Sequence, residues 1–203
     1  MGSGSRADLE ELWSGPFGDA YTDRNAEAFE LRGPFWEQLL TAREPRSVLE
    51  VGCNVGANLR WIVQHVDRRS VVGVDVNEGA LARLRTQDPH MNVLHSSARS
   101  LPFRDRAFDL VLTMGVLIHI ARDVLPTAMA EIVRCSARFV LCGEYFAEEE
   151  TAVDYRGEAG ALFKRDYGGL YASLFPELDL VERGFLGRDQ GWDDVTWWLF
   201  RRA

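Results

Sequence analysis

Gly52, Asn54 and Gly56 recur at every second position directly after the apolar run at residues 47–51. Glycine adopts positive φ without strain, and asparagine is one of the few other residues that tolerate it. A loop of this kind at the end of a buried strand lets the backbone approach a ligand, and the helix that follows offers its free N–H groups. Asp75 ends the next apolar run, where a carboxylate suits a ribose diol. This spacing predicts a nucleotide-binding edge.

Two classes of nucleotide cofactor compete for such an edge. A nicotinamide fingerprint G-x-G-x-x-G would begin at Gly52, but it meets Asn54 and Ala57 where glycines are needed. The Tyr-x-x-x-Lys pair of many reductases is also absent, because no tyrosine has a lysine four residues later. The other class is S-adenosylmethionine, and a nicotinamide-dependent oxidoreductase stays open as the alternative.

Alternating strands and helices must position these residues. Short apolar runs predict strands at residues 47–51, 70–76, 91–96, 108–116 and 138–146. Helical spacing predicts helices at residues 6–13, 24–42 and 57–66, one capped by Asn77 and one capped by Asp123, with a turn-rich break at residues 14–23. The strands are apolar on both faces, which predicts an α/β fold with a mostly parallel sheet covered by helices on both sides.

The last third of the chain has a different pattern. Residues 160–175 predict a helix, and residues 178–185 and 193–202 predict two strands separated by a short loop. This pair would add an antiparallel strand to the edge of the sheet, giving a seven-stranded Rossmann-like architecture.

Composition excludes several classes of protein. The chain has 203 residues, 46% of them hydrophobic, and a net charge of −8, which is unlike the basic footprint of a nucleic-acid binder. No run is apolar over a membrane-spanning length. Three cysteines without paired spacing predict no disulfide framework and a cytoplasmic setting. Residues 1–5, MGSGS, are interpreted as a tag or a disordered N-terminus.

The motifs together resemble those of class I S-adenosylmethionine-dependent methyltransferases. Glu50-x-Gly52-x-Asn54-x-Gly56 resembles their motif I, and Asp75 stands at their acid after the second strand. The segments SSARSLPF (96–103) and FDLVLTMGVLIH (108–119) resemble the family's adenine-lining segment and fourth-strand motif. One departure is Ser97, which stands where the family often has an aspartate for the adenine amine.

The likeness extends over nearly the whole chain to one subgroup. LWSGPFGDAYTDRN, GVLIHI, GEYF, DYRGE, LFKRDYG and DDVTWWL resemble the methylases associated with pseudaminic acid biosynthesis. This resemblance implies a single methyltransferase domain over residues 6–203. Its parts would be a helical cap (6–45), a cofactor-binding core (46–146), an acceptor-side insert (147–175) and a C-terminal strand pair (176–203).

The resemblance implies S-adenosylmethionine as cofactor and S-adenosylhomocysteine as product. The expected cofactor-binding residues are Tyr21, Arg24, Asn25, Glu50, Gly52, Asn54, Gly56, Asp75, Val76, Asn77, Ser97, Ala98 and Met114. Among these, Arg24 could pair with the methionine carboxylate, Asp75 with the ribose, and Ser97 and Ala98 with the adenine.

The acceptor side is expected at the ends of the fourth and fifth strands and in the insert. His119 is the candidate catalytic base, with a loop or packing residue as the alternative. The expected acceptor contacts are Glu144, Tyr145, Tyr155, Arg156, Lys164 and Arg165, although the charges of the insert could equally form a solvated helix face. The histidines have no metal-ligand spacing, so no metal site is expected.

These observations predict a methyltransferase that acts on O or N of a small polar metabolite, with a sugar or sugar acid as the expected acceptor. Besides the oxidoreductase, a non-catalytic pathway partner that keeps the fold remains an alternative. The sequence does not give the oligomeric state, and it predicts neither a nucleic-acid nor a membrane partner.

Overall fold

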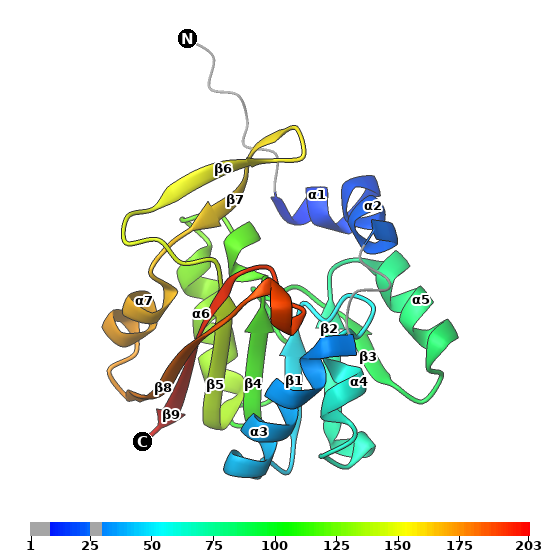
Figure 1. Cartoon of the computed structure of the whole chain (residues 1–203), viewed down its shortest axis with the longest axis vertical. Coiled ribbons are helices and arrows are strands. Elements are labelled where there is room, and N and C mark those ends of the chain that lie inside the picture. Colours follow the sequence, from blue (N-terminus) through cyan, green and yellow to red (C-terminus); the bar gives the residue numbers. More distant parts are fainter. Residues whose placement is uncertain (1–8, 25–29) are drawn as a thin grey trace.

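A seven-stranded sheet forms the centre of the protein (Figure 1). The computed structural model describes residues 9–24 and 30–203. The strands of the sheet are β1 (Val48–Val51), β2 (Val71–Asp75), β3 (Asn92–His95), β4 (Phe108–Met114), β5 (Ser136–Glu144), β8 (Leu178–Leu186) and β9 (Val195–Arg202). Their order is β3-β2-β1-β4-β5-β9-β8. The pairs β5–β9 and β9–β8 are antiparallel, and the other neighbouring strands of this sheet are parallel. The predicted α/β fold with an antiparallel edge is therefore confirmed.

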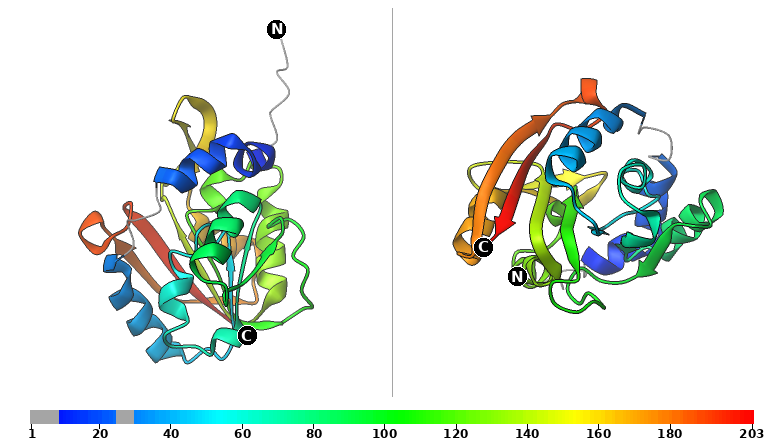
Figure 2. Two further views of the ribbon diagram at one scale, coloured as in Figure 1. Left: turned by 90° about the vertical axis from the view of Figure 1, so that its right-hand side faces the viewer. Right: turned by 90° about the horizontal axis from the view of Figure 1, so that it is seen from below.

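Helices cover both faces of the sheet, as Figure 2 shows from two further directions. One face packs against α3 (Gly33–Arg43), α4 (Leu59–Ile62) and α5 (Glu78–Gln87), and the other against α6 (Leu125–Cys135) and α7 (Tyr167–Leu174). Trp36 on α3 and Met129 on α6 are fully buried in the two separate cores. Each large apolar side chain buried in this way contributes roughly 1.5–3 kcal/mol, so the strands are held from both sides.

Two segments far apart in the sequence lie across one end of the sheet (Figure 1). They are the helix pair α1 (Leu9–Ser14) and α2 (Pro16–Arg24), and the hairpin of β6 (Thr151–Tyr155) and β7 (Glu158–Lys164). The Asn77 amide, at the carboxyl end of β2, donates to the Trp13 carbonyl at 3.1 Å and to the Asp19 carboxylate at 3.0 Å. These contacts place the helix pair over the carboxyl ends of the parallel strands.

The predicted break at residues 14–23 is wrong, because most of it forms α2. Pro16 occupies the first helical position, where its missing N–H costs nothing. Gly18 supports the close approach of the two helices, since a Cβ at this position would overlap the Trp13 carbonyl. Glycine and proline here serve helix packing and helix initiation instead of a loop.

The predicted helix at residues 160–175 is wrong in its first part. Residues up to Lys164 belong to β7, which pairs with β6, and only α7 is helical. Arg156 and Gly157 join the two strands with φ values of 54° and 89°, as a two-residue hairpin turn requires. An arginine at positive φ is uncommon, so the turn carried no recognisable Asn-Gly signal.

Smaller differences concern helix ends. The predicted helix at residues 57–66 is regular only over α4. Of the one at 24–42, the described residues from 30 onward form the 3₁₀ turn η1 (Glu30–Arg32) and α3. Asn77 caps α5 as predicted, accepting from the Ala80 N–H at 2.6 Å, but α6 begins after Val124 without a side-chain cap from Asp123.

Residues 1–8 and 25–29 lie outside the described residues. They include the predicted tag or disordered N-terminus, Asn25, and parts of the helices predicted at 6–13 and 24–42. Within the part of the chain that the structure describes, every helix is too short or too polar to cross a membrane.

Candidate active site

A cavity of about 650 Å³ lies over the carboxyl ends of β1, β2 and β4, beneath α1 and the β6–β7 hairpin. Its position is a topological switch point, because β2 and β4 flank β1 on opposite sides. The predicted site residues on its wall are Tyr21, Glu50, Gly52, Asn54, Asp75, Val76, Asn77, Ala98, Met114, His119, Tyr145, Tyr155 and Arg156. The fold therefore brings most of the predicted residues to one cavity.

The loop after β1 has the backbone that its sequence predicts. Gly52, Asn54 and Gly56 have φ values of 79°, 46° and 74°. A Cβ at Gly52 would overlap a Val116 methyl group in the loop after β4, so only glycine lets the two loops meet. Gly56 does not line the described cavity wall, and a Cβ there would lie 2.8 Å from a Leu84 methyl. Gly56 serves packing against α5.

The Asp75 carboxylate links the loops after β1 and β2. One oxygen accepts from the Asn54 N–H and the other from the Asn77 N–H, both at 2.8 Å. Burial nonetheless raises the pKa of Asp75, although these backbone hydrogen bonds oppose the shift. The two oxygens offer about four acceptor positions, more than the backbone N–H groups of Asn54, Val76 and Asn77 use, so this carboxylate can still accept a hydroxyl from the cavity.

Glu50 is a buried carboxyl group with one oxygen that has no hydrogen-bond partner among the described residues. Its Oε1 accepts from the Asn58 amide at 2.7 Å, while Oε2 is buried and has no hydrogen-bond partner among the described residues. Burial raises the pKa of Glu50 to about 8. An unpartnered buried oxygen on a cavity wall is a site for a cationic hydrogen-bond donor.

Arg32 completes this end of the cavity, and no sequence motif indicated its role. Its guanidinium donates to Asn58 Oδ1 at 3.2 Å and to the Gly191 carbonyl at 2.9 Å, and lies 4.2 Å from the centre of the Trp192 ring. Arg32, Asn58 and Trp192 all line the cavity. Nothing is described of the Arg24 side chain, to which the sequence assigned the cationic role.

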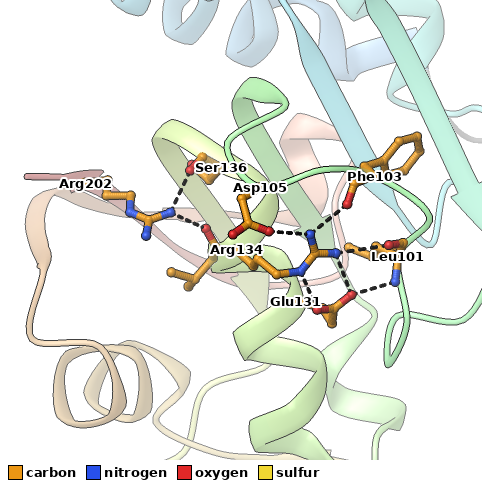
Figure 3. Close-up of polar contacts among 8 residues, drawn as sticks. Leu101, Phe103, Asp105, Glu131, Arg134, Ser136 and Arg202 are labelled. Atoms are coloured by element: carbon orange, nitrogen blue, oxygen red, sulfur yellow. Dashed lines mark hydrogen bonds and ion pairs between the residues drawn. The ribbon is translucent and has the colours of Figure 1, made fainter.

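Side chains of α6 hold the loop between β3 and β4 in place through hydrogen bonds. Figure 3 shows the Arg134 guanidinium donating to the Leu101 and Phe103 carbonyls, at 3.0 and 2.7 Å, and to the carboxylates of Asp105 and Glu131. Glu131 in turn accepts from the Leu101 N–H at 2.8 Å. These bonds hold the loop whose beginning, at residues 96–99, contributes to the cavity wall.

Ser97 occupies a different position from the one expected. Its hydroxyl donates to Glu10 on α1 at 2.6 Å, and the residues of this loop that line the cavity are Ser96, Ala98 and Arg99. Ser97 thus links α1 to this loop, and Ala98 lines the cavity whereas Ser97 does not.

His119 ends the 3₁₀ turn η3 (Leu117–His119) after β4 and lines the cavity. Its Nδ1 lies 2.8 Å from the Ala161 carbonyl on β7. Because a carbonyl oxygen only accepts, Nδ1 carries the hydrogen and Nε2 is left with a lone pair. Burial lowers the pKa of His119 to about 4, so the ring is neutral at pH 7. This weakens the prediction of a strong general base and favours a hydrogen-bond acceptor.

Glu144 was predicted to contact the acceptor, but it lies beneath the cavity. It is fully buried, and its carboxylate accepts from the N–H groups of Val116, Leu117 and Ile118 at 3.0–3.2 Å. Burial raises its pKa to about 7 against these hydrogen bonds. Glu144 therefore positions the turn that carries His119.

Lys164 and Arg165 also fall outside the cavity wall that the structure describes. Arg165 is buried, pairs with Glu150 at 2.8 Å and donates to the Ile120 carbonyl at 3.1 Å. Arg165 joins the hairpin to the loop after η3, and its charge is paired with the Glu150 carboxylate. Of the charged residues predicted for the acceptor, only Arg156 lines the cavity.

The sequence of this chain is similar to those of known methyltransferases. Residues 48–138 match the family described as a methyltransferase domain. A probable S-adenosylmethionine-dependent methyltransferase of Mycolicibacterium smegmatis is 35% identical over 75 residues, which are 37% of this chain and 28% of that protein. The chain thus spans less than half the length of this relative.

Solved structures resemble the fold over its whole length. A Burkholderia thailandensis 1,6-didemethyltoxoflavin-N1-methyltransferase, bound to S-adenosylhomocysteine, superposes with a TM-score of 0.76 at 15% identity, covering 100% of this chain and 93% of that one. The Synechocystis magnesium protoporphyrin IX methyltransferase gives 0.73 at 11% identity, covering 96% and 98%. Residues 48–138 therefore resemble a methyltransferase domain in sequence, and the chain has the Rossmann-like fold of class I S-adenosylmethionine-dependent methyltransferases.

Proposed function

We propose that this chain transfers the methyl group of S-adenosylmethionine to an oxygen or nitrogen atom of a small polar metabolite. When bound, the cofactor supplies an electrophilic methyl group on a sulfonium sulfur. The observation that carries the proposal is the buried, unpartnered Oε2 of Glu50 on a cavity wall that also contains Arg32 and Asp75. An amino-acid zwitterion attached to a nucleoside needs a carboxylate, a cation and a ribose acceptor of this kind.

The methionine end would lie between Glu50 and Arg32. The ammonium charge would stabilise ionised Glu50, so Glu50 would release its proton and Oε2 would accept from the ammonium group. The Arg32 guanidinium would donate to the carboxylate of the cofactor. Asn58 bonds to both side chains and holds them in place. Arg32 is accordingly a candidate for the role that was expected of Arg24, while Tyr21 and Asn54 line the same cavity.

The nucleoside would extend towards β2 and the loop after β3. Asp75 would accept from the ribose hydroxyls, with Val76 and Asn77 beside it. The Ala98 backbone and the Met114 side chain would border the adenine, a role for which Ser97 is the weaker candidate because its hydroxyl is bound to Glu10.

The acceptor would enter beneath the hairpin, next to His119, Tyr145, Tyr155 and Arg156. The resemblance to the pseudaminic acid-associated methylases favours a sugar or sugar acid, and that subgroup stays a prediction. The two structural neighbours named above act on other small molecules, as their names state. We also propose that residues 6–203 work as one domain in the cytoplasm, which suits three free cysteines.

Binding of two related ligands tests the methionine end. S-adenosylhomocysteine and 5′-methylthioadenosine share the nucleoside and the sulfur, but only the first has the amino-acid group. We expect Arg32→Ala to weaken S-adenosylhomocysteine binding by about 1.5–3 kcal/mol and to leave 5′-methylthioadenosine binding unchanged in calorimetric titrations. Arg188→Ala, on the exposed rim of the same cavity, is the matched control. Equal loss for both ligands would contradict the assignment.

Turnover separates the enzyme from a non-catalytic partner with the same fold. Labelled S-adenosylmethionine, incubated with nonulosonic-acid intermediates and with a broader set of hydroxylated and N-heterocyclic metabolites, should yield a labelled acceptor. A protein that binds S-adenosylhomocysteine and labels none of these compounds would favour the non-catalytic alternative.

A further inference from the structure

The charges on the cavity wall are unevenly distributed. Glu50, Asp75 and Arg32 lie at the end of the cavity formed by the loops after β1 and β2. Glu10 and Arg99 pair with each other at 2.9 Å, and Arg188 pairs with Asp194 at 3.4 Å. Arg156 and Asp193 are exposed on the rim. Among the described residues, no charged side chain forms a hydrogen bond or ion pair with His119, and none contributes to the shift of its pKa.

The surroundings of His119 are aromatic and apolar. Its ring centre lies 4.0 Å from that of Trp13 and 5.6 Å from that of Tyr155. Ile118 and Leu162 are buried beside it on the same wall. The pKa of His119 agrees, since burial lowers it and the only opposing influence is the hydrogen bond to the Ala161 carbonyl. A carboxylate or phosphate placed here would lose its water without gaining a counterion, which is costly.

Nε2 is the one polar atom that this His119 ring has left to offer. Nδ1 donates to Ala161, and Nε2 has no hydrogen-bond partner among the described residues. A neutral imidazole with this tautomer accepts one hydrogen bond and donates none at Nε2. It therefore selects a group that carries a hydrogen, such as a hydroxyl or a ring N–H.

We propose that the half of the acceptor next to His119 is an uncharged ring with an apolar face, which donates one hydroxyl or ring N–H hydrogen to Nε2. Any acid group of the acceptor would lie at the far end, towards Arg156 on the rim. This inference rests on the proposed methyl-transfer function and narrows its substrate class. Under this proposal the reacting end of the acceptor is uncharged. It is therefore distinct from the anionic group that Lys164 and Arg165 were expected to bind.

Three probes of one shape test this inference with binding as the readout. They are 2-naphthol, which donates a hydrogen, 2-methoxynaphthalene, which cannot, and 2-naphthoate, which is charged. Each is titrated by fluorescence or calorimetry into the whole chain saturated with S-adenosylhomocysteine. We expect 2-naphthol to bind about tenfold tighter than either of the others, as one satisfied buried hydrogen bond implies.

A substitution at His119 tests whether Nε2 causes the tighter binding of 2-naphthol. His119→Phe keeps an aromatic ring but removes the acceptor, so 2-naphthol should bind no tighter than 2-methoxynaphthalene. His90→Phe, with His90 outside the cavity wall, should keep the wild-type ranking. The ranking in the wild-type protein remains decisive if His119→Phe fails to fold.

Binding of 2-naphthoate as tight as that of 2-naphthol would overturn the inference, and so would S-adenosylhomocysteine binding without binding of any probe. Failure to bind S-adenosylhomocysteine would instead refute the proposed function, so the two failures are distinguishable.

Discussion

The two ends of the cavity are held together by different forces. At the cofactor end, Asp75 is fixed by backbone N–H groups of two adjacent loops, and Glu50 by the amide of Asn58 eight residues later. At the acceptor end, Trp13, His119 and Tyr155 come from three segments that meet through ring contacts, and the hydrogen bond from His119 to Ala161 spans 42 residues.

The two ends of the cavity therefore depend on different parts of the chain. The cofactor end consists mostly of strand ends and tight turns, so residues close in sequence determine most of it, with Arg32 as the exception. The acceptor end depends on how the α1–α2 pair and the β6–β7 hairpin settle over the sheet. Substitutions at the first end should change cofactor binding, and substitutions at the second should change acceptor binding or stability.

The largest effect is expected at Gly52. Gly52→Ala places a Cβ in the left-handed region, at about 1–2 kcal/mol, and overlaps Val116, at roughly 1–3 kcal/mol more. S-adenosylhomocysteine binding should be lost in calorimetry while circular dichroism still shows a folded protein. Gly157→Ala is the matched control, because its φ is 89° but open space surrounds its Cβ position. Normal binding by Gly52→Ala would show that this turn is not the cofactor cradle.

The next effect is a fall in stability with rising pH. The folded protein holds the proton of Glu50 up to about pH 8, whereas the unfolded chain releases it near 4.5. The native state therefore binds more protons between these values, and the free energy of unfolding should fall by up to roughly 1.4 kcal/mol per pH unit from this group. Glu144, with a pKa raised to about 7, acts in the same direction.

Urea unfolding of Glu50→Gln at pH 5, 6, 7 and 8 isolates the share of Glu50. The variant should give a flatter dependence than the wild type, and Glu37→Gln, which changes an exposed carboxylate on α3, should match the wild type. If the free energy of unfolding of Glu50→Gln depends on pH as steeply as that of the wild type, Glu50 is not the source of the pH dependence.

A smaller loss is expected for Asp75→Asn. The substitution removes the charged acceptor for the ribose and leaves one backbone N–H without its carboxylate partner, so S-adenosylhomocysteine should bind about 1–3 kcal/mol more weakly. Calorimetry measures this, with the exposed Asp67→Asn as control. Unaltered affinity would contradict the ribose role.

The smallest effect should come from Lys164. Lys164→Ala should change neither stability nor S-adenosylhomocysteine affinity by more than about 0.5 kcal/mol. Its neighbour Arg165 bonds to Glu150, Ile120 and Tyr167, so Arg165→Ala should lower the free energy of unfolding by about 1–3 kcal/mol without weakening cofactor binding. A selective loss of cofactor affinity in either variant would contradict this account, because it would place residues 147–175 at the cofactor end of the cavity.

The same contrast explains what could be predicted from the sequence. Gly52, Asn54 and Asp75 are recognisable because strand, turn and helix follow each other at fixed spacing, and the sheet itself followed from apolar runs. Arg32 could not be found in this way, since it reaches Asn58 and Gly191 only after folding. The hairpin was missed because an arginine adopts positive φ at its turn.

Glu144 and Arg165 were misassigned for a related physical reason. Polar residues at strand ends are usual ligand contacts, but both side chains satisfy backbone groups inside this fold. Sequence pattern gives the position of a side chain along a strand, whereas its partner depends on neighbouring segments.

The most direct test of the central claim is a pair of calorimetric titrations of the whole chain, one with S-adenosylhomocysteine and one with NADH. We expect S-adenosylhomocysteine to bind at one site, and NADH to give no measurable heat. Tight binding of NADH without binding of S-adenosylhomocysteine would contradict the assignment of the cavity and favour an oxidoreductase.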